Sequence, residues 1–308
     1  MNKIALSAGN LTKIYSKNNS LNESVLALNK LNLEVKEGEI FGLLGPNGAG
    51  KTTFINILGG TVIKTSGKVE LWGFDLDNNP RQVRASIGIV PQEVNFDPFF
   101  SPRKLLELQA GFYGVKKENR ITDLILKMVS LEKQANSYAR SLSGGMKRRL
   151  LIAKAMVHQP PILILDEPTA GVDVELRKNL WENVKELNKL GVTIILTTHY
   201  LYEAQEMCDR IGIINKGNLV ALNTTQKLLE QIETKKIKFK VKNFNNFEKI
   251  KLNNVKFIKD DSEITAIYNK NKFKFDEIIN IVKKNVEILD ISTDDADLED
   301  VFLEVTNN

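Results

Sequence analysis

The chain has 308 residues, of which 42% are hydrophobic and 26% charged, and its formal net charge is +5. This composition is ordinary for a soluble globular protein with one large or two smaller domains. No apolar run approaches the roughly 20 residues that cross a bilayer, and the first residues lack a signal-peptide pattern. The single cysteine, Cys208, excludes an internal disulfide framework and favours a reducing, cytoplasmic compartment.

Short apolar segments alternate with helical ones through much of the chain, which predicts a mostly parallel sheet covered on both faces. A strand over residues 40–44 is followed by a glycine-rich loop and a helix. The other strands that we predict span residues 31–35, 67–73, 86–92, 161–168 and 192–199, with a strand pair over 210–222. Helices are predicted over residues 174–191 and 202–209.

Two regions depart from this alternation. Between residues 93 and 160 the apolar spacing is helical, over 103–114, 120–131 and 145–159, which predicts an inserted all-helical subdomain. After residue 232 the chain becomes rich in lysine and asparagine, with strands predicted over 236–241, 255–259, 263–268 and 286–292 and helices over 275–285 and 296–306. We therefore expect a first domain over residues 1–232 and a small α+β accessory domain with an antiparallel sheet over 233–308.

Residues 45–52 read GPNGAGKT, the pattern of a phosphate-binding loop between a strand and a helix. Successive backbone N–H groups form an anion-binding nest at a helix N-terminus. Lys51 would bring its charge to the β- and γ-phosphates, and the Thr52 hydroxyl would hold Mg²⁺. An ordinary glycine-rich turn is the disfavoured alternative. The predicted nucleotide contacts of this loop are Gly45, Pro46, Asn47, Gly48, Ala49, Gly50, Lys51, Thr52 and Thr53.

Two carboxylates end the apolar strand over residues 161–168, at the edge where open α/β sheets bind ligands. Asp166 is predicted to be the second Mg²⁺ contact, through water. Glu167, one residue further, would orient or deprotonate an attacking water. The alternative is a helix N-cap cluster with Pro168 at the start of the helix.

Two further polar residues follow apolar strands. His199 ends the strand over 192–199; it is either a structural histidine or, as we favour, a side chain that reaches the γ-phosphate and the attacking water. Gln92, at the mouth of the helical insertion, is interpreted as a linker that senses Mg²⁺ and nucleotide. As an isolated glutamine it would be a weak signal.

The motifs GPNGAGKT, VPQ, LSGGM, LILDEPT, AGVD and TTH occur in this order. With them the sequence resembles an ABC-type ATPase from about residue 4 to residue 232. The resemblance explains the glycine pair, Gly144 and Gly145, at the N-terminus of the helix predicted over 145–159, where helix propensity disfavours glycine. It implies that Ser143, Gly144 and Gly145 cap the γ-phosphate of ATP held by the opposing subunit of a head-to-tail dimer.

Further roles are implied by the resemblance alone. Tyr15 matches the aromatic that stacks on adenine, with a core tyrosine as the alternative. Asp173 matches an acid that communicates across the dimer, and Gln92 matches the Mg²⁺-sensing glutamine. Phe99 and Phe100 either line the cleft for a membrane subunit or belong to the core.

Met146 replaces a common glutamine and AGVD replaces SALD, variants that resemble ATP-binding subunits of ABC-2-type exporters in the drug-resistance-like branch. The resemblance implies ATP and Mg²⁺ as cofactors, a homodimer, and an integral membrane permease that holds the chain at the inner face of the membrane, with no nucleic acid. The alternative is a soluble ABC ATPase of translation or DNA repair. Those relatives usually carry two cassettes, long coiled coils or zinc motifs. A P-loop kinase or GTPase is disfavoured by LSGGM and TTH.

Overall fold

The computed structural model describes residues 3–16, 24–170, 174–231, 233–244, 246–260, 263–294 and 297–307. The chain divides into two compact units, Met1–Asn223 and Thr224–Asn308. The second unit begins at Thr224 and not at residue 233 as expected from composition, because α8 (Thr225–Glu230) packs with α10 (Leu298–Asn307) of the same unit. None of the described helices is both long enough and apolar enough to span a bilayer.

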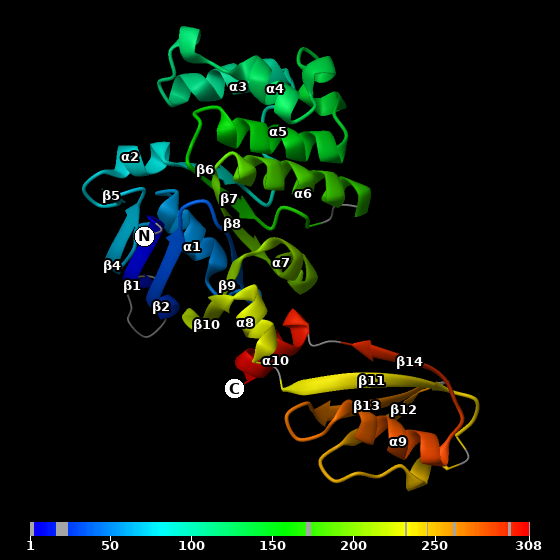
Figure 1. Ribbon diagram of the computed structural model, residues 1–308. Coiled ribbons are helices and arrows are strands. Elements are labelled where there is room, and N and C mark those ends of the chain that lie inside the picture. Colours follow the sequence, from blue (N-terminus) through cyan, green and yellow to red (C-terminus); the bar gives the residue numbers. More distant parts are fainter. Residues whose placement is uncertain are drawn as a thin grey trace. The chain divides into compact units, whose positions relative to one another are not determined.

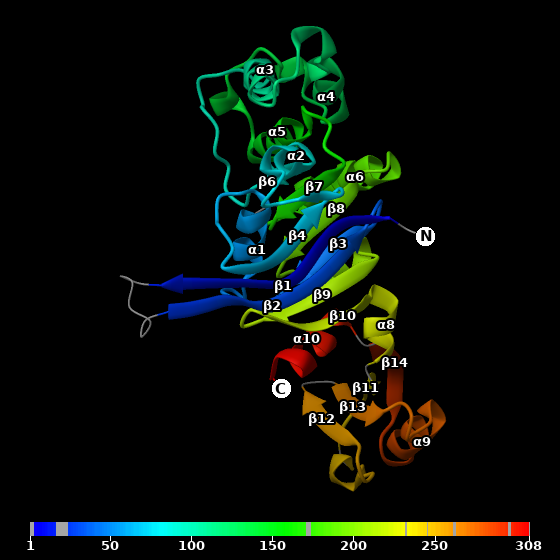
Figure 2. The same ribbon diagram turned by 90° about the vertical axis from the view of Figure 1, so that its left-hand side faces the viewer.

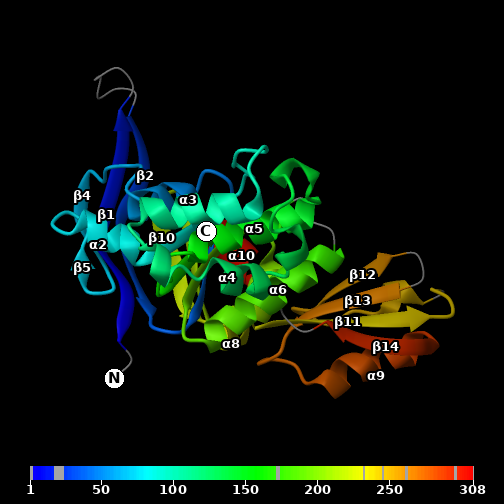
Figure 3. The same ribbon diagram turned by 90° about the horizontal axis from the view of Figure 1, so that it is seen from above.

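The first unit contains an antiparallel sheet with the strand order β2-β1-β4-β5. Its strands are β1 (Ile4–Ser16), β2 (Ser24–Lys36), β4 (Ser66–Leu71) and β5 (Phe74–Asp75). β1 and β2 lie side by side as a long pair (Figure 2, Figure 3). Sequence analysis predicted only the end of β2 and missed β1, because several register shifts along the β1–β2 pair interrupt the alternation of inward side chains.

The central sheet has the strand order β10-β9-β3-β8-β7-β6, and β3 runs parallel to both β8 and β9 while β7 runs parallel to β6 and β8. β3, β7 and β8 are buried along their whole length, as expected for strands with both faces covered. The strands are β3 (Ile40–Leu44), β6 (Ile87–Val90), β7 (Ile162–Asp166), β8 (Thr193–Thr198), β9 (Arg210–Asn215) and β10 (Asn218–Thr224). The accompanying helices are α1 (Lys51–Leu58), α2 (Pro80–Ala85), α6 (Val174–Lys189) and α7 (Leu201–Met207). The predicted α/β fold with a mostly parallel central sheet is confirmed.

The inserted helical subdomain is formed by α3 (Pro102–Phe112), α4 (Thr122–Met128) and α5 (Gly144–Met156), which gather at one end of the first unit (Figure 1). Their inward residues, among them Leu106, Leu126 and Leu150, form a separate apolar core. α5 also packs closely against β6 of the central sheet. A Cβ built on Gly88 of β6 would lie 2.3 Å from the carbonyl oxygen of Ala155, so this approach requires glycine.

The second unit is a four-stranded antiparallel sheet with the order β12-β13-β11-β14, packed against α9 (Figure 1). Alternate residues of β11, such as Ile237 and Phe239, are fully buried against Ile278 and Val282 of α9. The bounds are β11 (Thr234–Val241), β12 (Lys256–Asp260), β13 (Glu263–Asn269), α9 (Phe275–Asn285) and β14 (Ile288–Asp294). This is the small α+β arrangement that the sequence predicts.

Candidate nucleotide-binding and catalytic site

The phosphate loop connects buried β3 to the N-terminus of α1, as predicted. Gly48 and Gly50 have φ angles of 78° and 113°, in the left-handed region that favours glycine. A Cβ on Gly50 would lie 2.5 Å from the carbonyl oxygen of Ala27 in β2. These two positions let the loop curl tightly, so that its N–H groups and the N-terminus of α1 can face one anion.

Lys51 is the buried cation of this loop, with a side chain that is only 6% exposed. Its Nζ donates hydrogen bonds to the carbonyl oxygens of Gly45 at 2.6 Å and Pro46 at 3.1 Å. Burial lowers the pKa of Lys51, while the carboxylates of Glu167 and Asp166 act to raise it. The loop thus holds its ammonium group close to both predicted acidic residues.

The parallel pairing of β7 with β8 places Asp166 opposite Thr197. The Thr197 hydroxyl donates a 2.6 Å hydrogen bond to Oδ1 of Asp166. Burial raises the pKa of the Asp166 carboxyl group, and repulsion by Glu167 adds to this effect, against the hydrogen bond from Thr197 and the charge of Lys51. Asp166 is therefore a buried carboxylate whose charge lacks full compensation from its surroundings.

Glu167 brings three of the predicted residues together. Its Oε2 accepts a 3.1 Å hydrogen bond from Nε2 of Gln92 and lies 3.3 Å from Nδ1 of His199. Its backbone has φ = 45°, a left-handed conformation that costs a non-glycine residue about 1–3 kcal/mol. The Glu167 N–H group is held by the carbonyl oxygen of Thr197 at 3.0 Å. The carboxylate is thus aimed by contacts on both its backbone and its side chain.

A cavity of about 520 Å³ lies over the phosphate loop. Residues 47–53 form one wall, and Gln92, Glu167 and His199 lie on another. Sequence reasoning missed the third wall, which consists of Val25, Leu26 and Ala27 of β2. Val25 and Leu26 are apolar yet exposed, so this wall offers a surface for an apolar ring beside an anion-binding loop.

Tyr15 lies near the end of β1, where its register partner is Val25 of the cavity wall. Its side chain is 40% exposed, so the core alternative is wrong. The Nζ of Lys13 lies 4.7 Å from the centroid of the Tyr15 ring. Asp173, by contrast, lies outside the described residues.

The residues of the LSGGM motif, called the signature from here on, stand apart from this cavity; they begin α5, the signature helix. Ser143 is the N-cap of α5, and its hydroxyl oxygen accepts a 3.3 Å hydrogen bond from the N–H group of Met146. Gly145 is buried and Gly144 is exposed. A Cβ built on Gly144 would meet no atom of the chain within 4 Å. None of the three residues lines the cavity over their own phosphate loop.

The oxygen donors near the loop fit Mg²⁺. Thr52 offers a hydroxyl, Asp166 a carboxylate and Gln92 an amide oxygen, because the amide nitrogen of Gln92 is engaged with Glu167. The described residues include no group of three or more His, Cys, Asp or Glu side chains that could cage a metal. A donor set of one hydroxyl, one carboxylate and one amide oxygen suits an ion that keeps several waters and shares its coordination with substrate phosphates.

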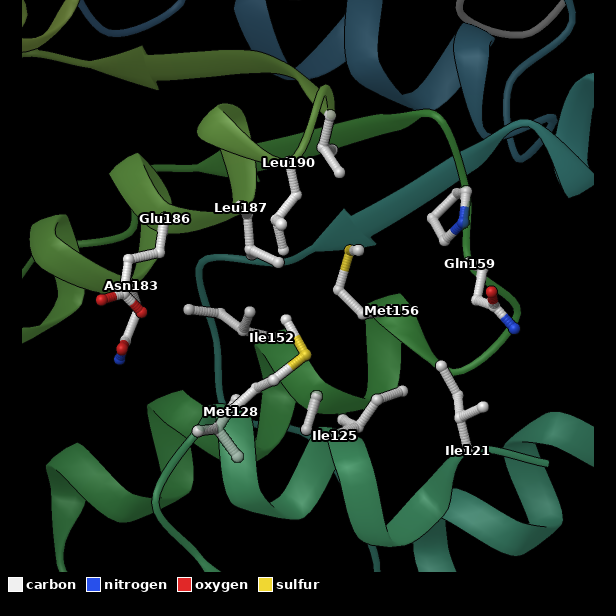
Figure 4. Close-up of a pocket in the computed structure, with 14 residues that line it drawn as sticks. Ile121, Ile125, Met128, Ile152, Met156, Gln159, Asn183, Glu186, Leu187 and Leu190 are labelled. Carbon is white, nitrogen blue, oxygen red and sulfur yellow. The ribbon is translucent and has the colours of Figure 1, made fainter.

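A second cavity, of about 210 Å³, lies between α4, α5 and α6 (Figure 4). Its lining is mostly aliphatic, with Ile125, Ile152 and Leu187 facing one another across it. Its charged side chain, Glu186, is an anion that would repel a triphosphate. The cavity over the phosphate loop is therefore the candidate nucleotide site.

Comparison with known proteins identifies the family. The ABC transporter family model matches residues 28–170. The chain is 37% identical over 230 residues to the linearmycin resistance ATP-binding protein LnrL of Bacillus subtilis (strain 168), covering 74% of this chain and 71% of that protein. The chain belongs to the ABC transporter family. This ABC cassette is also 40% identical over 207 residues to the Nod factor export ATP-binding protein I of Burkholderia orbicola (strain AU 1054), covering 67% and 68% of the two chains.

Solved structures agree. A dimeric bacterial ABC transporter cassette matches with a TM-score of 0.63 and 30% identity, covering 71% of this chain and 98% of that one. A dimeric cassette in a post-hydrolysis state, bound to ADP and phosphate, matches with a TM-score of 0.63 and 29% identity, with the same coverage. The chain is thus an ABC cassette ATPase whose relatives include exporter and drug-resistance subunits, as its motifs indicated.

The raised pKa of Asp166 gives a prediction about stability. The folded state holds the proton of the Asp166 carboxyl group more tightly than the unfolded state does. The free energy of unfolding therefore falls as the pH rises through the pKa of Asp166 in the folded state, and it stays lower above that pKa. We expect Asp166→Asn to raise the melting temperature of the nucleotide-free, metal-free chain at pH 8. The difference in melting temperature between variant and wild type should shrink as the pH falls toward 3.8, the ordinary pKa of this carboxyl group. Differential scanning fluorimetry over a pH series measures this.

The matched control is Asp123→Asn. The hydrogen bond from Arg103 lowers the pKa of Asp123, so its carboxylate is favoured in the folded state and its loss should not raise the melting temperature. A lower melting temperature for Asp166→Asn at pH 8 would contradict the argument, because it would mean that nearby cations stabilise this carboxylate more than burial destabilises it.

Proposed function

We propose that the chain binds and hydrolyses MgATP as a head-to-tail homodimer with two composite sites, and that this cycle powers an ABC-2-type membrane exporter. The observation that carries the proposal is the position of Glu167 on the wall of the phosphate-loop cavity, with Gln92 and His199 at its Oε2. A carboxylate so held can orient a water for in-line attack on a terminal phosphate.

The other residues have complementary roles in this proposal. The loop N–H groups and Lys51 bind the triphosphate and stabilise charge that develops on the γ-phosphate. Thr52, Asp166 and Gln92 would hold Mg²⁺, which neutralises phosphate charge when bound. His199 supports the water and Glu167. Tyr15 offers an exposed ring beside Val25 on which adenine can stack.

The proposed dimer follows from the position of the signature. The N-terminus of α5 presents N–H groups and a positive helix end, which suit an anion. Gly144 leaves open space in front of that backbone, and these residues do not reach the cavity of their own chain. A second copy carrying ATP is the occupant that fits, and a relative of known structure is a dimeric cassette.

A groove of about 330 Å³ is the proposed permease contact. It lies between the end of α1, β6 and the helices α3 and α5, next to Pro91 and hence close to Gln92. Arg84 and Lys154 give it positive charge, which suits an acidic cytoplasmic segment of a membrane protein. Phe99 and Phe100 do not line this groove, and their exposure shows that they are not core residues.

Glu167→Gln tests the catalytic role. We expect this variant to bind ATP and form a stable ATP-dependent dimer, while its rate of phosphate release falls about 100-fold or more, the contribution expected of a general base. Phosphate release and size-exclusion chromatography with ATP measure the two effects. Glu206→Gln, an exposed residue of α7, is the control. Near-normal turnover of Glu167→Gln would refute the assignment.

Gly144→Val tests the composite site. Because an added Cβ meets nothing within 4 Å in the same chain, the melting temperature should not fall, and valine is the better helix residue. We nevertheless expect ATPase activity to fall about 10-fold or more, since a misplaced reaction centre costs rate steeply. Mixing Gly144→Val with Glu167→Gln should restore part of the activity, because one site of each mixed dimer is then intact. A fully active Gly144→Val chain would contradict the dimer proposal.

Arg84→Glu combined with Lys154→Glu tests the groove. When the chain is co-expressed with a candidate ABC-2-type permease that co-purifies with the wild-type chain, we expect these reversals to abolish co-purification and permease-dependent ATPase activity. The ATPase activity of the isolated chain should stay within about twofold, as for surface substitutions away from a site. Lys127→Glu, an exposed residue of α4, is the control. Co-purification of the wild-type chain with ribosomes or DNA instead would favour the soluble alternative.

A further inference from the structure

Arg148, in the second turn of α5, is an almost fully buried cation that our sequence analysis did not single out. Its guanidinium group has five N–H donors, and each meets a backbone carbonyl oxygen. Nε donates to Pro168 at 2.8 Å, and the two other nitrogens donate to Pro91 at 2.7 Å, Gln92 at 2.8 Å, Glu167 at 2.9 Å and Asp166 at 3.4 Å.

These five carbonyl groups belong to two separate segments of the nucleotide site. Pro91 and Gln92 follow β6, and Asp166, Glu167 and Pro168 lie at the end of β7. Arg148 itself belongs to the helix that begins with Ser143 and Gly144. The Arg148 side chain therefore connects α5, the segment that carries Gln92 and the segment that carries Glu167, the proposed general base.

The contact with Glu167 has a specific consequence for its geometry. The left-handed backbone of Glu167 is held at its N–H group by Thr197 and at its carbonyl group by Arg148. The Glu167 side chain is held by Gln92, whose own carbonyl group also accepts from Arg148. Loss of the guanidinium would release both the carboxylate and the glutamine that contacts it.

The neighbouring Arg149 shows that this arrangement is not a general property of the helix. It donates to the carbonyl oxygens of Val129 at 2.9 Å and Ser130 at 3.2 Å, both within the helical subdomain. Arg149 therefore connects α5 to its own subdomain, whereas Arg148 connects α5 to the catalytic strand. The two arginines form a natural pair of test and control.

We propose that Arg148 is a positioning residue that couples the signature helix to the water-orienting Glu167 of the same chain. When the N-terminus of α5 contacts the nucleotide of a partner, a shift of α5 is passed on to Gln92 and Glu167 through the five hydrogen bonds of the Arg148 guanidinium group. Occupancy of one composite site thereby tunes the geometry of the other. The inference rests on the proposed function, because it assumes that Glu167 acts on water and that α5 caps a partner's ATP.

The test compares Arg148→Lys with Arg149→Lys in the full-length chain. Lysine keeps the charge but lacks the planar fork, so it cannot satisfy five carbonyl groups. We expect Arg148→Lys to lower kcat about 10- to 100-fold, as a misplacement of about 1 Å does, while the Kd for a fluorescent ATP analogue stays within about threefold. Arg149→Lys should leave kcat within about twofold.

A double variant separates positioning from general structural damage. If Arg148 acts through Glu167, Arg148→Lys should cause no further loss of turnover in the Glu167→Gln background, because residues that act as a unit are not additive. Additive losses, an unchanged kcat for Arg148→Lys, or an equal loss for Arg149→Lys would overturn the inference. Arg148→Gln is the second variant, and failure of both Arg148 variants to fold would show that the contacts serve stability instead.

Failure of the proposed function has a different signature. If the wild-type chain did not hydrolyse ATP, or if Glu167→Gln retained normal turnover, the assignment of the reaction centre would be wrong whatever Arg148 does. If both behave as expected and Arg148→Lys turns over like the wild type, only the coupling role is lost.

Discussion

The parallel pairing of β3, β8 and β7 is the constraint on which the site depends. Because parallel strands place their carboxyl ends at one edge of the sheet, the phosphate loop after β3, His199 after β8 and Glu167 after β7 meet although they are far apart in the chain. These three strands are buried along their whole length. A shift of one residue would turn every side chain of a strand to the opposite face of the sheet, so the residues at the strand ends would no longer meet.

The buried charges at this edge of the sheet compensate one another only in part. Lys51 and Asp166 are both buried, and burial disfavours the charged form of each. It therefore lowers the pKa of Lys51 and raises the pKa of Asp166. A triphosphate with its bound cation would add further partners, an anion for the lysine and a cation for the carboxylate. Burial of these two charges is therefore unfavourable for folding, and binding of the substrate would relieve it, which is a common reason for active sites to reduce stability.

The core sheet and the inserted helices carry different parts of the proposed composite site. The core sheet carries the phosphate loop and the carboxylates, whereas α5 presents its N-terminus away from the cavity of its own chain. Two close contacts keep the parts in register: the approach of Ala155 to Gly88, which needs glycine, and the five hydrogen bonds of Arg148. These contacts suit a helix whose position is to affect the geometry of the catalytic residues.

The sequence by itself determined the phosphate loop, the acidic pair, the alternating α/β pattern and the helical insertion, because each depends on local spacing of residue types. It did not reveal β1, whose alternation is broken by register shifts, or the apolar cavity wall of Val25 and Leu26. Only the tertiary structure decided that Gln92 and His199 meet at one oxygen of Glu167 and that Arg148 binds five carbonyl groups. Every residue has a backbone carbonyl group whatever its side chain, so a sequence pattern cannot predict which carbonyl groups accept these hydrogen bonds.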